Sequence, residues 1–132
     1  MSEYNIEDEK WTNHDDDFYR HRDSHACGFL DGRVIIAGGS SSHDDTDANV
    51  EIIDVDTWDN NHDHDLNEGR HDPGYGVLDG DFYVFGGHHQ ESLTSIEKWD
   101  HDSWDFITLE KTLKTGRENP SCFTARRSQI CA

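Results

Sequence analysis

The stretch LDGRVIIAGG at residues 30–39 recurs as LDGDFYVFGG at residues 78–87, an offset of 48 positions without a gap. Each copy places the dipeptide Asp-Gly after an apolar run, followed by a second apolar run and a pair of glycines. Asp-Gly suits the tight type I′ turn that joins two antiparallel strands. The second run is rich in β-branched or aromatic residues, as strands are. Both stretches therefore predict a β-hairpin that ends in a sharp bend at the glycine pair.

The repeat continues on both sides of the hairpins. Arg22 is matched by Arg70 and Glu51 by Glu97, and tryptophan recurs at Trp11, Trp58 and Trp104. Each full unit is predicted to form four strands. In the first unit these are residues 26–30, 33–37, 50–55 and a fourth near Trp58. In the second unit they are residues 74–78, 81–85, 95–100 and a fourth near Trp104. A repeat of this length is typical of a blade of a β-propeller. We therefore expect an all-β fold, an incomplete propeller of about two to three four-stranded antiparallel blades.

The ordered set of repeated residues resembles the Kelch family. The resemblance covers roughly residues 4–125 and is carried by the two Asp-Gly turns and by Arg22, Arg70, Gly38, Gly39, Gly86, Gly87, Glu51, Glu97, Trp58 and Trp104. It implies blades packed around a central channel, with partners bound by the loops on one face. Fold alone does not give activity, because the family serves many unrelated functions.

Two features depart from the family pattern. The segment after Trp58, residues 59–65, is rich in Asp, Asn and His, so we expect the outer strand of some blades to be short or frayed. The chain also divides into only two full repeats, 16–64 and 65–110, flanked by last strands at 1–15 and a partial repeat or tail at 111–132. Closed propellers usually have four or more blades. Three interpretations stay open: a fragment of a longer propeller, an open arc that needs a partner, and two copies that close one ring.

Composition limits the choice of partners. The formal net charge is −18 and hydrophobic residues make up 32% of the chain. Phosphates would be repelled, so neither a nucleic acid nor an anionic membrane is expected as a partner, whereas a basic protein is favoured. No apolar run reaches the length of about 18 residues that a spanning helix needs. The odd number of cysteines fits a reducing compartment, and we expect a cytoplasmic protein in which Cys27 and Cys122 are small buried residues.

Histidine and aspartate cluster at 14–17, 43–47, 62–65 and 101–102. Adjacent residues of a strand point to opposite faces, so contiguous ligands rarely converge on one ion. We interpret these clusters as solvated acidic loops and expect no metal, no cofactor and no enzymatic activity. No nucleophile motif, phosphate loop or Cys-x-x-Cys pair is present. The repeated tryptophans are predicted to pack between blades, and the repeated Arg and Glu to form structural ion pairs.

The function that these residues favour is protein–protein interaction, as a scaffold or a substrate-recognition adaptor. Candidate partner-binding residues lie in the two loops that follow the glycine pairs, namely Ser41, Ser42, His43, Asp44, His88, His89, Gln90 and Glu91. The family resemblance implies a possible link to ubiquitin-ligase complexes, although the chain has no room for an F-box or BTB domain. Self-association could complete a propeller. The alternatives are a propeller-type metal-dependent enzyme and an acidic protein that binds divalent cations.

Overall fold

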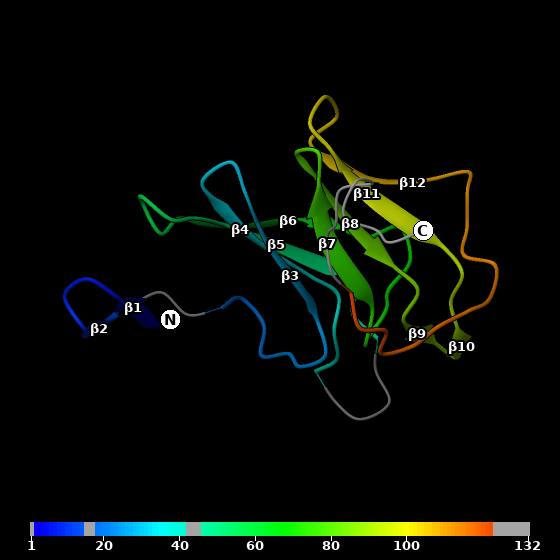
Figure 1. Cartoon of the computed structure of the whole chain (residues 1–132), viewed down its shortest axis with the longest axis horizontal. Helices are drawn as coiled ribbons and strands as arrows, with labels where there is room; N and C mark the ends of the chain where they lie inside the picture. Colours follow the sequence, from blue (N-terminus) through cyan, green and yellow to red (C-terminus); the bar gives the residue numbers. More distant parts are fainter. Residues whose placement is uncertain (1, 15–17, 42–45, 123–132) are drawn as a thin grey trace, which may run out of the picture.

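The computed structural model describes residues 2–14, 18–41 and 46–122, and all regular elements within them are β-strands (Figure 1). The strands are β1 (Ser2–Asn5), β2 (Lys10–Asn13), β3 (Ala26–Leu30), β4 (Arg33–Ala37), β5 (Asn49–Asp54), β6 (Asn60–Asp65), β7 (Gly74–Leu78), β8 (Asp81–Phe85), β9 (His88–His89), β10 (Glu91–Ser92), β11 (Ile96–Asp100) and β12 (Asp105–Thr108). The predicted all-β class is confirmed. Within these residues there is no helix that could cross a membrane.

Two four-stranded antiparallel sheets form the body of the molecule. Blade 1 has the strand order β3-β4-β5-β6, and blade 2 has the order β7-β8-β11-β12. Each is a meander, because sequential strands are neighbours. A separate hairpin, β1-β2, precedes blade 1 and lies apart from it in Figure 1, and the short β9-β10 hairpin lies within the β8–β11 connection. The order and antiparallel pairing are those expected of an incomplete Kelch-type propeller.

Both Asp-Gly turns have the predicted conformation. Asp31 and Gly32 have φ values of 49° and 76°, and Asp79 and Gly80 have values of 53° and 88°. Two successive positive φ values define a type I′ turn, whose twist matches that of the flanking strands. The turns join β3 to β4 and β7 to β8 in the expected register, and the pairs next to the turns are Leu30 with Arg33 and Leu78 with Asp81.

The core lies between the two blades. Small residues on the facing side of β3 leave room for large ones of blade 2: a Cβ added at Gly28 would lie 2.5 Å from the Phe82 ring. Phe82 is fully buried, and Trp99 and Phe106 pack beside it with their ring centroids 5.5 Å apart. Blade 1 contributes aliphatic residues such as Ile35 to the same cluster. Burial of about 25 cal/mol for each Å² of apolar surface makes this interface the main stabilising contact between the sheets.

The outer strand and the tryptophan register differ from the sequence-based expectation. β6 is not frayed: it pairs with β5 along its length, with one register shift between Val50 and Ile52, and its half-buried and exposed residues alternate. Trp58 and Trp104 occupy equivalent turn positions, with φ values of 63° and 55°. Trp11 is not equivalent to them, because it lies inside β2 opposite Tyr4.

Trp11 and Trp58 differ in position because the preceding turn, and not the tryptophan, is what the units share. Asn5, Asp54 and Asp100 each accept backbone N–H bonds from the next residues of the turn through a side-chain oxygen. Such side-chain capping fixes a turn that closes four residues later in left-handed backbone. That position is Glu9 in the first hairpin, with a φ of 52°. A spacing of 47 between tryptophans therefore did not mark a shared position.

The cysteine expectation was also wrong for the described residues. Cys27 and Cys122 are exposed rather than buried. Cys27 lies in β3 opposite Ile36, on the face that points away from blade 2, and Cys122 follows the strands instead of occupying one. Side chains alternate between the two faces of a strand, so Cys27 lies on the free face while its neighbour Ala26 is buried in the core. Cys131 lies outside the described residues.

Candidate interaction site at the connector end

The segments that enter each blade repeat one another. We call residues 18–25, 66–73 and 113–120 connectors 1, 2 and 3; connector 2 joins β6 to β7, and connector 3 follows β12. Each of the last two crosses the glycine pair of the blade that precedes it: the Gly39 N–H donates to the Arg70 carbonyl over 2.8 Å, and the Gly87 N–H donates to the Arg117 carbonyl over 2.7 Å. These bonds explain the glycine pairs, because both members have positive φ and side chains there would strike the connectors.

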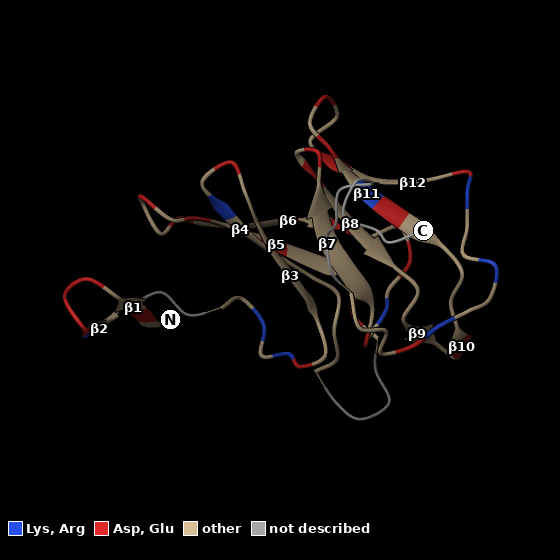
Figure 2. Ribbon diagram, in the orientation of Figure 1, with Lys and Arg blue, Asp and Glu red and all other residues tan. Residues whose placement is uncertain are grey.

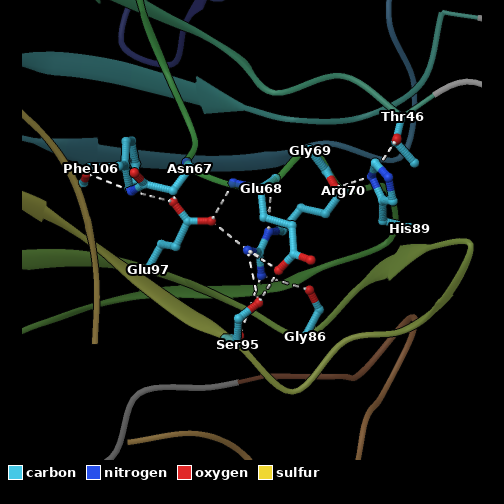
Figure 3. Close-up of polar contacts among 10 residues, drawn as sticks. All are labelled: Thr46, Asn67, Glu68, Gly69, Arg70, Gly86, His89, Ser95, Glu97 and Phe106. Carbon is cyan, nitrogen blue, oxygen red and sulfur yellow. Dashed lines mark hydrogen bonds and ion pairs between the residues drawn. The ribbon is translucent and has the colours of Figure 1, made fainter. Parts of the chain in front are cut away.

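Arg70 turns its side chain away from the blade that its backbone crosses and into blade 2 (Figure 3). Its guanidinium is fully buried and pairs with the equally buried carboxylate of Glu97. It also donates to the carbonyl of Gly86 over 3.0 Å and to the hydroxyl of Ser95 over 3.1 Å. One side chain therefore fixes the glycine pair, the start of β11 and the connector of blade 2.

Blade 1 contains the same network around Arg22. Its guanidinium lies 2.8 Å from the Glu51 carboxylate and donates to the carbonyls of Gly38 and Asn49 over 3.0 and 2.7 Å. The Asn49 side chain accepts a further bond over 2.7 Å, in the place that Ser95 has in blade 2. Both Arg–Glu ion pairs expected from the repeat are therefore formed, and in both blades the arginine also donates to a carbonyl of the glycine pair.

The two carboxylates hold the connectors as well. Glu97 accepts the backbone N–H groups of Asn67 and Glu68 over 2.6 and 3.1 Å. Glu51 accepts those of Tyr19 and Arg20 over 2.8 and 3.3 Å. A buried carboxylate is stable only when its charge and lone pairs are satisfied in this way. Connector 1 is thus fixed to blade 1 through Glu51, and connector 2 is fixed to blade 2 through Glu97.

The loops after the glycine pairs lie at this connector end, where the β9-β10 hairpin is seen in Figure 1. His89 joins the two loops, because its Nδ1 lies 2.9 Å from the Thr46 hydroxyl and 3.0 Å from the Gly69 carbonyl (Figure 3). Gln90 closes the β9-β10 turn with a φ of 63°. His88 pairs with His71 of connector 2 through two backbone bonds of 3.2 and 2.9 Å.

The structure brings part of the predicted loop set together. His88 and His89 are half-buried, whereas Gln90, Glu91 and Ser41 are exposed at the same end. Ser42, His43 and Asp44 lie outside the described residues. Ser40, next to Ser41, is bound to Asp23 of connector 1 by two backbone bonds of 3.0 Å.

The tryptophans lie elsewhere. Trp58 stacks on His14 of the preceding segment, with ring centroids 3.5 Å apart. Trp104 lies beneath the Arg33 guanidinium of blade 1, which is 5.3 Å from its ring centroid, and meets Trp99 edge-on. Each therefore contacts the unit before its own, at the turns opposite the connector end. Their side chains are not part of the candidate site.

Charge is distributed unevenly along the blades (Figure 2). Asp and Glu are concentrated in the turns opposite the connector end, and Lys and Arg are concentrated in the connectors. Two of the connector arginines, Arg22 and Arg70, are neutralised by the buried glutamates. Burial, together with the charge of Arg22, lowers the pKa of His25 below its ordinary value and so favours the neutral imidazole. In the ranges that the structure describes, no group of three or more His, Cys, Asp or Glu is arranged to hold a metal ion.

Apart from Arg22 and Arg70, sequence reasoning missed the residues of the connectors. Asp72 and Asn119 were not singled out, although both form backbone hydrogen bonds at this end. Thr46, which contacts His89, lay in the cluster 43–47 that was interpreted as a solvated acidic loop. The signal that could have found them is the pattern Leu-x-x-Gly-Arg, which occurs at residues 66–70 and again at 113–117. In both copies the leucine N–H bonds to a carbonyl of the preceding blade, and the glycine passes close to its backbone.

Repeated four-stranded meanders, packed face to face and joined by connectors that cross glycine pairs, define a repeat protein built from propeller-type blades. Residues 69–108, which span blade 2 and the end of connector 2, match the family model of the Kelch motif. The chain thus carries a Kelch repeat, as its sequence pattern predicts, and blade 1 repeats the same strands in the same order. Comparison with curated proteins gave no match. Kelch repeats are in general non-enzymatic scaffolds for protein interaction.

Proposed function

We propose that the chain is a protein-interaction module that binds its partner at the connector end of the blades. The observation that carries the proposal is the contact of His89 with Thr46 and Gly69, which gathers two loops and a connector into one surface. Loops held by a rigid scaffold are where binding residues are generally found. The Arg–Glu networks provide that scaffold, because they fix the glycine pairs and the connectors from which the loops emerge.

A narrower form of the proposal is a substrate-recognition adaptor within a ubiquitin-ligase complex. The Kelch repeat supports an interaction role in general, and the adaptor role adds that the same surface recruits a substrate while another chain supplies the ligase contact.

Glu91 and Asp102 offer a matched pair of probes, because both are exposed acidic residues at opposite ends of blade 2. Glu91 lies in the β9-β10 hairpin, and Asp102 lies in the turn before β12.

The test is quantitative affinity purification from extracts of the source cells with wild-type protein, Glu91→Lys and Asp102→Lys. Both variants change the net charge by the same amount, so non-specific electrostatic capture shifts equally in both. We expect a set of partners that Glu91→Lys loses and Asp102→Lys retains. Loss of the same partners from both variants would refute a site at the connector end. Ubiquitin-ligase subunits among the partners that Asp102→Lys retains would support the narrower proposal.

Self-association is a second proposal, and exposed apolar side chains support it. Phe29 on the free face of blade 1 is 60% exposed, and Leu78 and Ile107 on the free face of blade 2 are 45% and 39% exposed. These faces are equivalent to the two that pack together in the core, so two copies could join through them. Light scattering coupled to size exclusion tests this, and a monomer mass at micromolar concentration would rule it out.

A further inference from the structure

Three equivalent positions in successive connectors form a ladder. Ser24, Asp72 and Asn119 have φ values of 54°, 49° and 48°, all in the left-handed region. The Asp72 N–H donates to the Ser24 carbonyl over 2.8 Å, and the Asn119 N–H donates to the Asp72 carbonyl over 2.7 Å. Aspartate and asparagine tolerate this backbone better than most residues. The ladder therefore fixes three polar side chains in one row along the connector end.

These three residues line a pocket of about 430 Å³. The volume is within the range of small-ligand sites, and it is large enough for one long side chain. Its walls include the rings of Pro73, Tyr75 and Pro120. Such surfaces suit the methylene stem of a long side chain, and a tyrosine face also attracts a cation.

Asp72 supplies the charge of the pocket. Its side chain is 35% exposed, and its carboxylate contacts the Nδ1 of His71 at 2.9 Å. None of the described residues that line the pocket is Lys or Arg. Arg22, whose charge acts on His25, does not line the pocket and is itself paired with Glu51 at 2.8 Å. A partly buried carboxylate is thus left without a cationic side chain in the wall that surrounds it.

His25 contributes a largely apolar ring to the pocket wall. Its Nδ1 is buried and has no hydrogen-bond partner among the described residues, and the same side chain also borders a second pocket beside Arg22. Burial lowers the pKa of this imidazole, which favours its neutral form beside a bound cation. A neutral imidazole has one nitrogen that accepts a hydrogen bond.

We propose that this pocket, which we call the connector pocket, binds a single lysine or arginine side chain of a protein partner. The cation contacts the Asp72 carboxylate and the stem packs on Tyr75 and the prolines. The inference rests on the proposed function and adds the chemistry of the partner to it. The formal net charge of −18 favours the same partner, because it steers basic surfaces toward the chain.

The test is an NMR titration of the isotope-labelled full chain with short Gly/Ser peptides that carry one central residue. Arginine and lysine peptides are compared with citrulline and norleucine peptides, which keep the shape without the charge. The protein variants are Asp72→Asn, which keeps the left-handed backbone, and the control Asp63→Asn. Asp63 is exposed in β6, away from the lining residues, and its substitution changes the net charge equally.

We expect the arginine and lysine peptides to shift the amide signals of Asp72, Tyr75 and Asn119. We expect Asp72→Asn to weaken their binding by about tenfold, the usual effect of one charge-assisted hydrogen bond, and Asp63→Asn by less than about twofold. Equal binding of the citrulline peptide, equal effects of the two variants, or no shift at these amides would overturn the proposal. The two proposals fail in different ways. If only the connector pocket is wrong, the peptides do not bind there, but Glu91→Lys still loses partners that Asp102→Lys retains in the affinity purification. If the proposed function is wrong, the two variants retain the same partners.

Discussion

Substituting Glu97 by Gln should destabilise the fold severely, although it preserves the shape of the side chain. The carboxylate is fully buried and accepts bonds from Arg70 and from two backbone N–H groups, those of Asn67 and Glu68. Breaking one partner of a buried ion pair costs about 3–5 kcal/mol, because the remaining charge stays buried without compensation. A chain of this size is stable by only about 5–15 kcal/mol, so the variant should approach the unfolding limit.

Urea unfolding followed by tryptophan fluorescence measures this effect, since Trp99 is only 3% exposed in the core. With an m-value of about 2 kcal/mol/M, the midpoint should fall by about 2 M. Asp54→Asn is the matched control: Asp54 is partly exposed, faces Arg33 at 4.0 Å, and retains its turn-capping oxygen as Asn. An exposed pair contributes about 0–1 kcal/mol. If Glu97→Gln lowers the midpoint no more than Asp54→Asn does, the Arg70–Glu97 network does not hold blade 2 as argued.

Three further changes test the packing and the protonation state of named residues. Gly28→Ala should destabilise the chain by about 1–3 kcal/mol, because the new Cβ would lie 2.5 Å from the buried Phe82 ring. Gly32→Ala, which meets nothing within 4 Å, should cost only the left-handed backbone penalty of about 1–2 kcal/mol. A loss at Gly28 well below about 1 kcal/mol in the same urea assay would contradict the close packing of Gly28 on Phe82. The folded chain lowers the pKa of His25, so the unfolded state binds more protons; stability should be complete above the unfolded pKa of about 6.5 and should fall as pH drops below it. His25→Gln should flatten that part of the profile, and an unchanged slope in the variant would show that other groups cause it.

The strand order of the blades followed from the sequence because its signals are local. An Asp-Gly dipeptide between two apolar runs specifies its own turn, and the observed φ values at Asp31 and Gly32 agree with it. The repeated Arg and Glu residues also predicted the ion pairs, since opposite charges that recur with the same spacing are expected to pair in the same way in each blade. These predictions depend on residue type and spacing alone, and both were met in blade 1 and in blade 2.

Other features of the structure depend on how the turns and loops are arranged in space, which residue spacing does not specify. Trp11 seemed equivalent to Trp58, yet the turn is set by the capping side chains of Asn5 and Asp54, which place the two tryptophans two positions apart. The contact of His89 with the other loop could not be predicted, because it joins residues of different repeats that share no pattern. The connector pocket likewise arises only when three connectors lie side by side.

The buried charges raise the question of why apolar residues do not fill these positions. Replacing Arg70 and Glu97 together by Met and Leu would fill the volume, and in many proteins such an exchange is neutral or stabilising. Here it would leave the N–H groups of Asn67 and Glu68 and the carbonyl of Gly86 without partners, since connector and glycine pair are irregular backbone that no β-ladder satisfies. The double variant should therefore recover little of the stability lost in Glu97→Gln. The ion pair is retained because irregular backbone at the connector end needs it, and that same irregular backbone carries the loops and the pocket proposed to bind the partner.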